Sequence, residues 1–505
     1  MSTPLPLALT RDSPPPTTEV STTKEVSGTP VRGRSNEPVS DIAVPPAGLG
    51  TSEVSGTAFS TLETSEVSGT VVPALGISEV SGTGISGTGI SEVSGTSGGR
   101  FGRFRYDFKA MVALVFAISF AKTIRLPNLW AATHMTFNYS HGFVRRGLVG
   151  QLLQLVAGER AFHYQPLALF GIGLFLAVVV AMVIHIRRAV AVDREDAEYW
   201  IAIILLGASP GTVFFVHEIG YFDYIGVLAL LGVLHLGTRS RNRFLLFPAV
   251  ALVGLVLAFI HEILVTMFVP TMFFTMVCLV VSELRATPAS RATWIRGSLA
   301  AVVAALIPFA ASATVGTIGT KPPAVIHAMK ESISRHVDFP LRNDAFDVLS
   351  KPFRDVLLKQ MPFHWSFREN RAYLIAGFVA IAPSLAFLLF YGLRVLMRVR
   401  TTPAARASMM TTFVAATVAP LFLNFVGWDN ARWNAIAVID GFGCIGAMRL
   451  FFGAEVAAGA PDSSRLTLAL GTAAIALGLC TSYNNFLFDG YTVRWFPFAE
   501  PLRWR

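Results

Sequence analysis

Charged residues are scarce in this chain. They make up 14% of its 505 residues, whereas an ordinary soluble protein contains about 25%. Hydrophobic residues make up 53%, so water is not the main solvent for most of the chain. Cysteine is also rare, and the three cysteines, Cys278, Cys444 and Cys480, lie inside apolar runs. This placement indicates no disulfide framework of the kind that small secreted domains use.

Several motifs of enzyme chemistry are missing from the sequence. It has no phosphate-binding glycine loop and no dinucleotide fingerprint, so direct use of a cytoplasmic nucleotide is not expected. His217-Glu218 and His261-Glu262 do not continue as zincin motifs, because Tyr221 and Val265 stand where the second histidine would be. The net charge of +9 lies in short clusters between apolar runs, which membrane topology explains better than nucleic-acid binding.

The first 99 residues differ in composition from the rest, with Phe59 as their single aromatic residue. Copies of Ser-Glu-Val-Ser-Gly-Thr recur there in steps of thirteen residues, beginning at Ser52, Ser65, Ser78 and Ser91. Such a segment cannot bury enough apolar surface to offset its ordering entropy. We therefore predict a disordered cytoplasmic tail over 1–99, its repeat being either functional or a product of slippage, and a transmembrane helical domain over 100–505.

Long apolar runs fill the second region. A membrane-spanning helix needs about 20 largely apolar residues. About eleven candidates occur, at 110–124, 166–186, 199–216, 221–236, 244–260, 263–281, 299–318, 372–396, 409–426, 434–452 and 466–486. The predicted fold class is all-α, a polytopic transmembrane helix bundle.

The orientation follows from arginine and lysine, which cytoplasmic loops retain. Basic clusters occupy alternate connections, before the first predicted span and after the second, fourth, sixth and eighth. They include Arg100, Arg187, Arg239, Arg285 and Arg394. This pattern predicts a multi-pass membrane protein with a cytoplasmic N-terminus and an extracytoplasmic C-terminus. We expect its membrane to be a bacterial inner (plasma) membrane.

The first extracytoplasmic connection, about 122–165, contains Ser-His-Gly-Phe-Val-Arg-Arg-Gly, which includes His141, Arg145 and Arg146. Apolar residues at helical spacing follow, which is typical of an amphipathic helix in the membrane interface. The paired arginines break the positive-inside pattern, so we expect an anion to compensate them, either a phosphate or a protein carboxylate. The alternative is anchoring to lipid headgroups.

Two further extracytoplasmic turns carry acids. His217, Glu218 and Asp223 lie between the third and fourth predicted spans, and His261 and Glu262 between the fifth and sixth. Carboxylates at the edge of hydrocarbon are costly and are usually paired or functional. A raised pKa would suit Glu218, Asp223 or Glu262 to general-base chemistry. Alternatively the two His-Glu pairs ligate a divalent metal, or the acids are polar stops paired with nearby arginines.

Two more extracytoplasmic segments complete the predicted polar face. The connection at about 319–371 is long and rich in lysine and arginine, which suits either a phosphate-bearing lipid or a folded cap with solvated charges. In Trp-Asp-Asn-Ala-Arg-Trp, the spacing of Asp429 and Arg432 suits an ion pair. Trp428 and Trp433 suit either an interfacial belt or stacking on a sugar face.

The predicted orientation, span number, interfacial helix and external charged clusters together resemble the GT-C class of multi-spanning glycosyltransferases, over about 101–505. The Ser-His-Gly-Phe-Val-Arg-Arg-Gly and Trp-Asp-Asn-Ala-Arg-Trp stretches also look like elements of uncharacterised bacterial membrane proteins. The GT-C class transfers a sugar from a polyprenyl-phosphate-linked donor, often with a catalytic carboxylate in the first external loop. This chain departs from that pattern, because 122–165 contains no aspartate and only Glu159.

The resemblance implies sugar transfer to a glycan or lipid acceptor in cell-envelope synthesis. Arg145 and Arg146 would hold the donor phosphate, and Glu218 or Asp223 would deprotonate the acceptor hydroxyl. The remaining predicted substrate-binding residues are His141, His261, Glu262, Trp428, Asp429, Arg432 and Trp433. Alternatives are a polysaccharide polymerase or ligase of the O-antigen kind, in which arginines carry transfer, a transporter, and a noncatalytic partner in envelope assembly.

Overall fold

The computed structural model describes residues 98–286, 291–352, 355, 368–425, 429–458 and 465–480. These residues form helices and connecting turns, with no strand among them, so the predicted all-α class is correct for this part of the chain. All of them belong to one compact unit, Glu92–Arg505. The predicted tail lies outside the described residues except for its last two, and Trp428 lies outside them as well.

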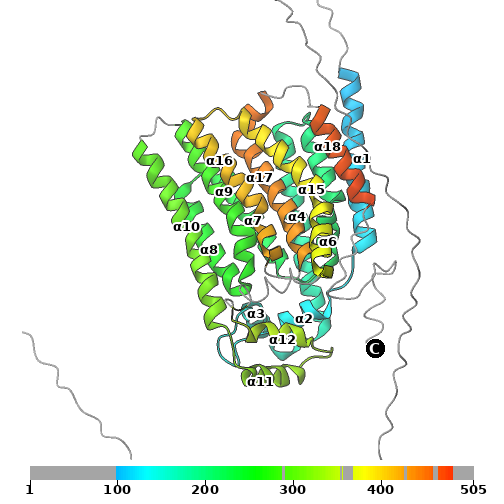
Figure 1. Cartoon of the computed structure of the whole chain (residues 1–505), viewed down its shortest axis with the longest axis vertical. Coiled ribbons are helices and arrows are strands. Elements are labelled where there is room, and N and C mark those ends of the chain that lie inside the picture. The colour runs from blue at the N-terminus through cyan, green and yellow to red at the C-terminus, as the bar shows by residue number, and fades with distance from the viewer. Residues whose placement is uncertain are drawn as a thin grey trace, which may run out of the picture. The chain divides into compact units, whose positions relative to one another are not determined.

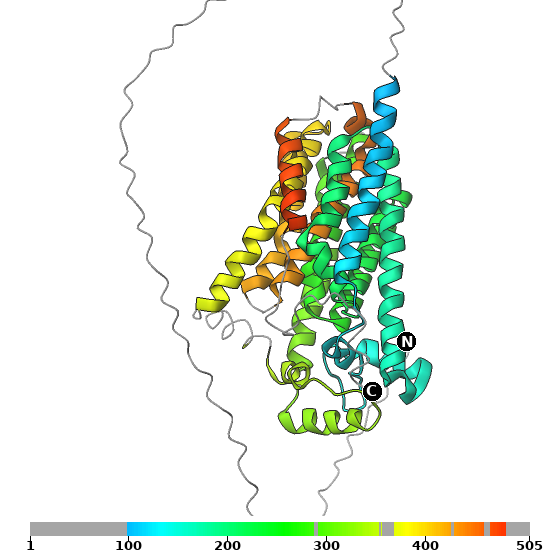
Figure 2. The same cartoon turned by 90° about the vertical axis from the view of Figure 1, so that its right-hand side faces the viewer.

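Twelve helices of the described part run side by side in a bundle (Figure 1 and Figure 2). They are α1 (Gly98–Thr123), α4 (Tyr164–Val192), α5 (Ala197–Ala208), α6 (Pro210–His217), α7 (Asp223–Ser240), α8 (Arg243–Ile260), α9 (Ile263–Ala286), α10 (Arg291–Ile318), α15 (Arg368–Arg398), α16 (Pro403–Val418), α17 (Asn430–Ala458) and α18 (Arg465–Cys480). The 3₁₀ helix η3 (Ala419–Phe425) continues α16.

Seven helical segments of the described residues are long and apolar enough to cross a membrane, which makes the chain a multi-pass membrane protein. They cover 164–192, 243–260, 263–285, 292–318, 374–398, 403–425 and 430–457. The remaining predicted spans coincide with α1, with α5 and α6 together, with α7 and with α18. The apolar parts of α1, α5 and α18 are shorter, and so the count of eleven is not reached by length and composition alone.

The predicted span at 199–216 is broken into α5 and α6. Pro210 disfavours helical geometry in the residue before it, and Ser209 has φ −64° and ψ 144°. The Ser209 hydroxyl accepts a hydrogen bond from the Thr212 amide at 3.2 Å, which caps the start of α6. The break therefore follows from local sequence, although the apolar run is continuous.

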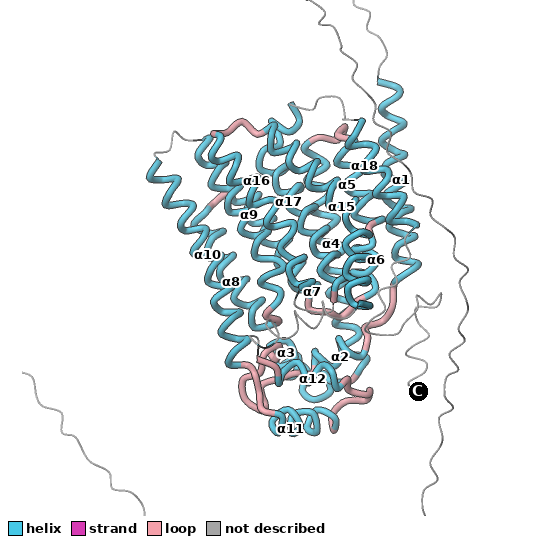
Figure 3. Tube along the Cα trace, viewed as in Figure 1, coloured by secondary structure: helices cyan, strands magenta, loops and turns pink. Residues whose placement is uncertain are grey.

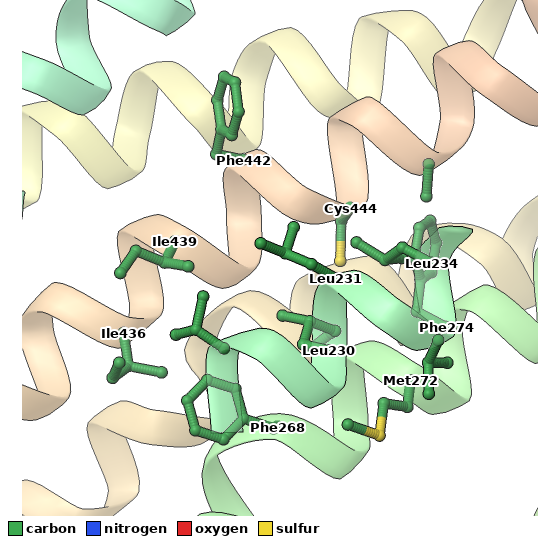
Figure 4. Close-up of a cluster of buried hydrophobic side chains, with 14 of the residues drawn as sticks. Leu230, Leu231, Leu234, Phe268, Met272, Phe274, Ile436, Ile439, Phe442 and Cys444 are labelled. Atoms are coloured by element: carbon green, nitrogen blue, oxygen red, sulfur yellow. The ribbon is translucent and has the colours of Figure 1, made fainter. Parts of the chain in front are cut away.

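α17 is the central helix of the bundle. Its membrane-length segment is 94% buried, compared with 28% for α4 and for α10, so α17 packs against protein on nearly every side. Side chains of α7 and α9 interdigitate with those of α17, as Figure 4 shows for Leu230, Phe268 and Ile436. Gly226 of α7 permits this packing, because a Cβ there would lie 2.1 Å from the Phe268 ring.

Four short helices form a cap at one end of the bundle, where most of the irregular described backbone also lies (Figure 1 and Figure 3). The cap consists of α2 (Leu129–Met135), α3 (Leu148–Ala157), α11 (Pro323–Ser334) and α12 (Asn343–Ser350). It has its own apolar cluster, in which Phe137 and Val144 contact Met329, Ile333 and Phe346. The two connections predicted at about 122–165 and 319–371 are thus packed together. In α3 the apolar residues Leu152, Leu155 and Val156 are exposed, as an interfacial helix requires.

A buried ionic network holds the opposite end of the bundle. Asp196 caps α5 by accepting from the Tyr199 amide at 3.1 Å, and its carboxylate also pairs with Arg449 of α17 and accepts from the Tyr391 hydroxyl of α15 at 2.7 Å. The Arg449 side chain is fully buried. Removing one partner of such a pair leaves a buried charge without compensation.

Asp196→Ala is therefore expected to lower the free energy of unfolding by about 3–5 kcal/mol, because Arg449 loses its carboxylate and α5 loses its cap. Thermal unfolding of the detergent-purified protein measures the change. Asp193→Ala is the matched control, since among the described residues that side chain accepts a hydrogen bond from the exposed Glu195 amide and from no other group. Equal effects of the two substitutions would show that the Asp196 pair does not stabilise the fold.

Candidate functional site

Between the cap and the bundle, three buried carboxylates each pair with arginine. The first pair joins Arg125, just after α1, to Glu218, just after α6, with 2.7 Å between Nη2 and Oε1. Arg125 Nε also donates to the His217 carbonyl at 2.7 Å. The second Glu218 oxygen accepts a hydrogen bond from the Asn128 side-chain nitrogen at 2.8 Å. The side-chain oxygen of Asn128 accepts from the Ala131 amide and so caps α2. This pair fixes the start of the cap on the end of α6.

The second pair compensates the two neighbouring arginines of the first connection with one carboxylate. Arg146 donates to both Glu262 oxygens, at 3.3 and 2.8 Å, and Arg145 Nη1 lies 3.5 Å from Oε1. Arg146 has φ +65°, a left-handed conformation that non-glycine residues seldom adopt and that is common at functional sites. The sequence predicts that either a phosphate or a protein carboxylate compensates Arg145 and Arg146. In the structure the Glu262 carboxylate lies beside both arginines.

Arg145 also ties the cap together. Its Nη2 donates to the carbonyl of Lys351 at 2.9 Å and to that of Val348, so α12 is held on the first connection. Its Nε is buried and has no hydrogen-bond partner among the described residues. Burial lowers the pKa of this guanidinium to about 10, and Glu262 opposes that shift. Arg145 therefore stays protonated at neutral pH with one donor unused.

The third pair, Asp223 with Arg432, is extended by a second carboxylate, Asp429, on the same guanidinium. Arg432, in the first turn of α17, donates to both oxygens of Asp223 at 2.5 and 2.7 Å, and to Asp429 at 3.0 Å. Asp223 is the first residue of α7 and is buried, whereas 28% of the Asp429 side chain is exposed. Burial raises the pKa of Asp429 above its ordinary value, although Arg432 opposes this. The predicted Asp429–Arg432 pair exists, with Asp223 as a third member.

A small pocket lies between these pairs. Its lining includes Trp130 and His134 of α2, Tyr221, His261 and Arg432. The Trp130 and Tyr221 rings are stacked with centroids 5.1 Å apart, and the Arg432 guanidinium lies 5.2 Å from the centre of the Tyr221 ring. The free space holds about one water molecule. The pocket is therefore closed to larger ligands in this conformation.

Both imidazoles of the pocket are neutral. Burial, reinforced by Arg146, holds the pKa of His134 well below its ordinary value and lowers that of His261 to about 3. Each has an Nε2 atom with no partner among the described residues. Burial would raise the pKa of the neighbouring Glu262, but Arg146, His261 and Arg145 reverse this and hold it well below its ordinary value. Glu262 is therefore a carboxylate.

Most of the residues predicted from sequence meet in this one cluster, although they come from four separate connections. They are Arg145, Arg146, Glu218, Asp223, His261, Glu262, Asp429 and Arg432. Only His261 and Arg432 of these line the small pocket itself. The structure thus brings these predicted residues together, and it also gives each buried acid of the cluster an arginine partner.

Two other predicted residues lie apart from the cluster. His141 is partly exposed in the first connection, with its Nδ1 2.9 Å from the Ser140 hydroxyl. Trp433 is 4% exposed and belongs to the apolar core, so its ring is not presented to a ligand or to the membrane interface. Among the described residues no group of three or more His, Cys, Asp or Glu side chains is arranged to hold a metal ion.

Sequence reasoning missed several members of the cluster. Arg125, Asn128, Trp130 and His134 all lie in the first connection, and Tyr221 stands next to the predicted acids. Arg125 offered one signal, because it breaks the positive-inside pattern in the same way as Arg145 and Arg146. The short α2 helix has no periodic apolar pattern to mark it.

Searches with the chain found no matching protein family model, no similar curated protein and no similar solved structure. The function must therefore be argued from the geometry of the cluster.

The two neutral imidazoles predict how stability depends on pH. Below pH 6.5 the unfolded chain takes up protons on His134 and His261, while the folded protein does not. The contribution of these histidines to the free energy of unfolding is therefore fully present above pH 6.5. It falls as the pH drops toward the folded pKa, which is about 3 for His261. Each histidine contributes about 1.4 kcal/mol per pH unit to the fall.

Urea unfolding between pH 5 and 6.5 measures this slope in wild type and in the double variant His134→Phe, His261→Phe. The variant is expected to show a shallower slope, and substitution of the exposed His327 by Gln is expected to leave it unchanged. A double variant with the wild-type slope would contradict the assignment of these imidazoles as neutral.

Proposed function

We propose that the protein is a membrane glycosyltransferase that transfers a sugar from a polyprenyl-phosphate-linked donor at the cap end of the bundle, for cell-envelope glycan synthesis. The observation that carries the proposal is the cluster between cap and bundle. It combines spare positive charge, a partly exposed carboxylate and aromatic rings at the edge of a membrane-spanning fold.

The spare positive charge supports a phosphate-bearing donor. Arg145 and Arg146 share the single carboxylate of Glu262, so one positive charge is not balanced by a direct partner. The unused Nε donor of Arg145 points to the same conclusion. Guanidinium groups are well suited to phosphate, because several N–H groups donate to its oxygens at once.

The carboxylates around Arg432 support proton transfer from an acceptor hydroxyl. Both Asp223 oxygens accept hydrogen bonds from Arg432, and both Glu218 oxygens accept hydrogen bonds from Arg125 and Asn128. Asp429 is the member with exposed surface and a raised pKa, which are the properties of a general base. We therefore place proton acceptance on the Asp223–Arg432–Asp429 chain, with Asp429 as its accessible end.

The aromatic rings support a sugar substrate. Trp130 and Tyr221 present flat apolar faces beside polar groups, as sugar-binding sites require. Because the pocket is closed, binding of a sugar ring requires the Trp130–Tyr221 stack to separate. Gly220, with φ +100°, lies next to Tyr221 and gives this turn a backbone conformation that other residues seldom adopt.

One observation favours transport as a second candidate function. Asp440 lies inside α17, is fully buried, and neither carboxyl oxygen has a hydrogen-bond partner among the described residues. An ionisable residue inside a membrane span is commonly part of an ion or proton pathway. A transporter would depend on Asp440 and not on Asp429.

Arg145→Ala and Asp429→Asn are each expected to lower glycan transfer at least about 100-fold, which is the usual contribution of a group that stabilises transition-state charge and of a positioned acid–base group. Cell-surface glycan and transfer by the purified protein are the measurements, and Arg335→Ala, an exposed cap residue, is the control. Asp223→Asn is tested alongside with its thermal stability, because this change also breaks the buried Arg432 pair.

Three outcomes separate the candidates. Wild-type amounts of glycan product from Arg145→Ala, Asp223→Asn and Asp429→Asn would reject the transfer roles. Loss of product in Arg145→Ala with full activity in Asp429→Asn and Asp223→Asn would favour a polymerase or ligase of the O-antigen kind, in which arginines carry transfer. Loss of glycan product in Asp440→Asn alone, with wild-type product from the other variants, would favour transport.

A further inference from the structure

A large apolar groove lies between α1 and α4, and its inner end reaches Val216, two residues before Glu218 of the charged cluster. α1 packs on α5 and α6, and α4 packs on α7 and α17. Besides α1 and α4, residues of α5 and α6 and one residue of α17 line the groove. Its volume is about 370 Å³. This volume is within the range of ligand sites, about 300–1,000 Å³.

The groove is built for hydrocarbon. Its walls include Phe116, Phe120, Phe175 and Val179, and Thr212 and Arg187 are the only lining residues with a polar or charged group other than the Trp200 indole. The groove opens to the outside of the bundle, where its lining residue Val183 is 47% exposed. In a bilayer this opening faces lipid chains.

The depth of the groove matches one leaflet. Along α4 its lining runs from Phe175 to Arg187, which is twelve residues or about 18 Å at 1.5 Å per residue. This length is close to half of the hydrocarbon thickness of a bilayer, about 30 Å. Along α4 the groove therefore runs for about the depth of one leaflet from the end of the bundle opposite the cap, and its inner end reaches Phe120 of α1 and Val216 of α6.

Polar groups at the mouth of the groove favour an anionic headgroup. Arg187 is exposed at the end opposite the cap and has no ion-pair partner among the described residues. Lys109 of α1 lies one turn before the groove-lining residues Val112 and Ala113, on the other flank of the mouth. Trp200 lines the same end, as tryptophan does at headgroup depth.

We infer that this groove binds one acyl chain of an anionic glycerophospholipid from the leaflet opposite the cap, with the lipid phosphate on Arg187. The inference does not rest on the proposed function. A chain belonging to a substrate at the cap would have its phosphate near Arg125 and Arg145, at the other end of α1. Basic residues beside a cleft between membrane helices are a common way of holding acidic lipids.

Native mass spectrometry of the full chain tests this inference, with phosphatidylglycerol and phosphatidylcholine of identical acyl chains as probes. Wild type is expected to retain one phosphatidylglycerol about fivefold more tightly than phosphatidylcholine, since one basic residue near the surface contributes about that factor. Arg187→Gln is expected to remove the preference, and Arg239→Gln, an arginine at the same end of the bundle but outside the groove, to keep it.

Filling the groove separates chain binding from headgroup binding. Val183→Trp and Ala113→Phe add bulk to exposed positions of the lining, so the fold is expected to persist, as thermal unfolding checks. Both variants are expected to lose the retained lipid of either kind. Retention in both, or equal binding of the two lipids by wild type, overturns the inference. A loss of retention in Arg125→Gln with none in Arg187→Gln also overturns it, because the chain would then belong to a lipid with its headgroup at the cap.

Discussion

Charge on a buried helix is the constraint on which the rest of the structure depends. α17 is enclosed on almost every side, yet it carries the guanidinium groups of Arg432 and Arg449, which are nearly or fully buried. An unpaired charge in such surroundings costs several kcal/mol. Arg432 is therefore matched by carboxylates at the cap end and Arg449 by Asp196 at the other, so α7 and α5 are fixed to the central helix at opposite ends.

The same requirement decides which groups at the cap remain available for chemistry. Most of the acids are used to neutralise arginines, and a carboxylate bound on both oxygens by guanidinium is a poor proton acceptor. What is left is specific: the exposed side of Asp429, the Nε atom of Arg145, and one ring nitrogen each of His134 and His261. These groups come from the first connection, the α8–α9 turn and the start of α17, and they meet only because the pairs assemble the cluster.

The sequence predicted the general place of this cluster better than its contacts. Arginine clusters in alternate connections indicate which turns share a side, and this was enough to group Arg145, Glu218, Glu262 and Arg432. The pairing itself was not predictable, because Arg125 and Glu218 are 93 residues apart and Arg432 and Asp223 are 209 apart. Arg449 and Asp440 were missed although each stands inside a predicted span, where any charge is itself a signal. The break at Pro210 was likewise readable locally but was hidden by a continuous apolar run.

Arg145 connects two segments that are about 200 residues apart in sequence, because its guanidinium donates hydrogen bonds to carbonyls at the end of α12. The neighbouring Arg146 donates to Glu262. A displacement of α12 away from the bundle would remove the carbonyl acceptors from Arg145 and leave several of its donors free at once. The contacts that hold α12 on the first connection are thus the same ones that occupy the donors of Arg145, so the packing of the cap and the capacity of this side chain to attract an anion are coupled.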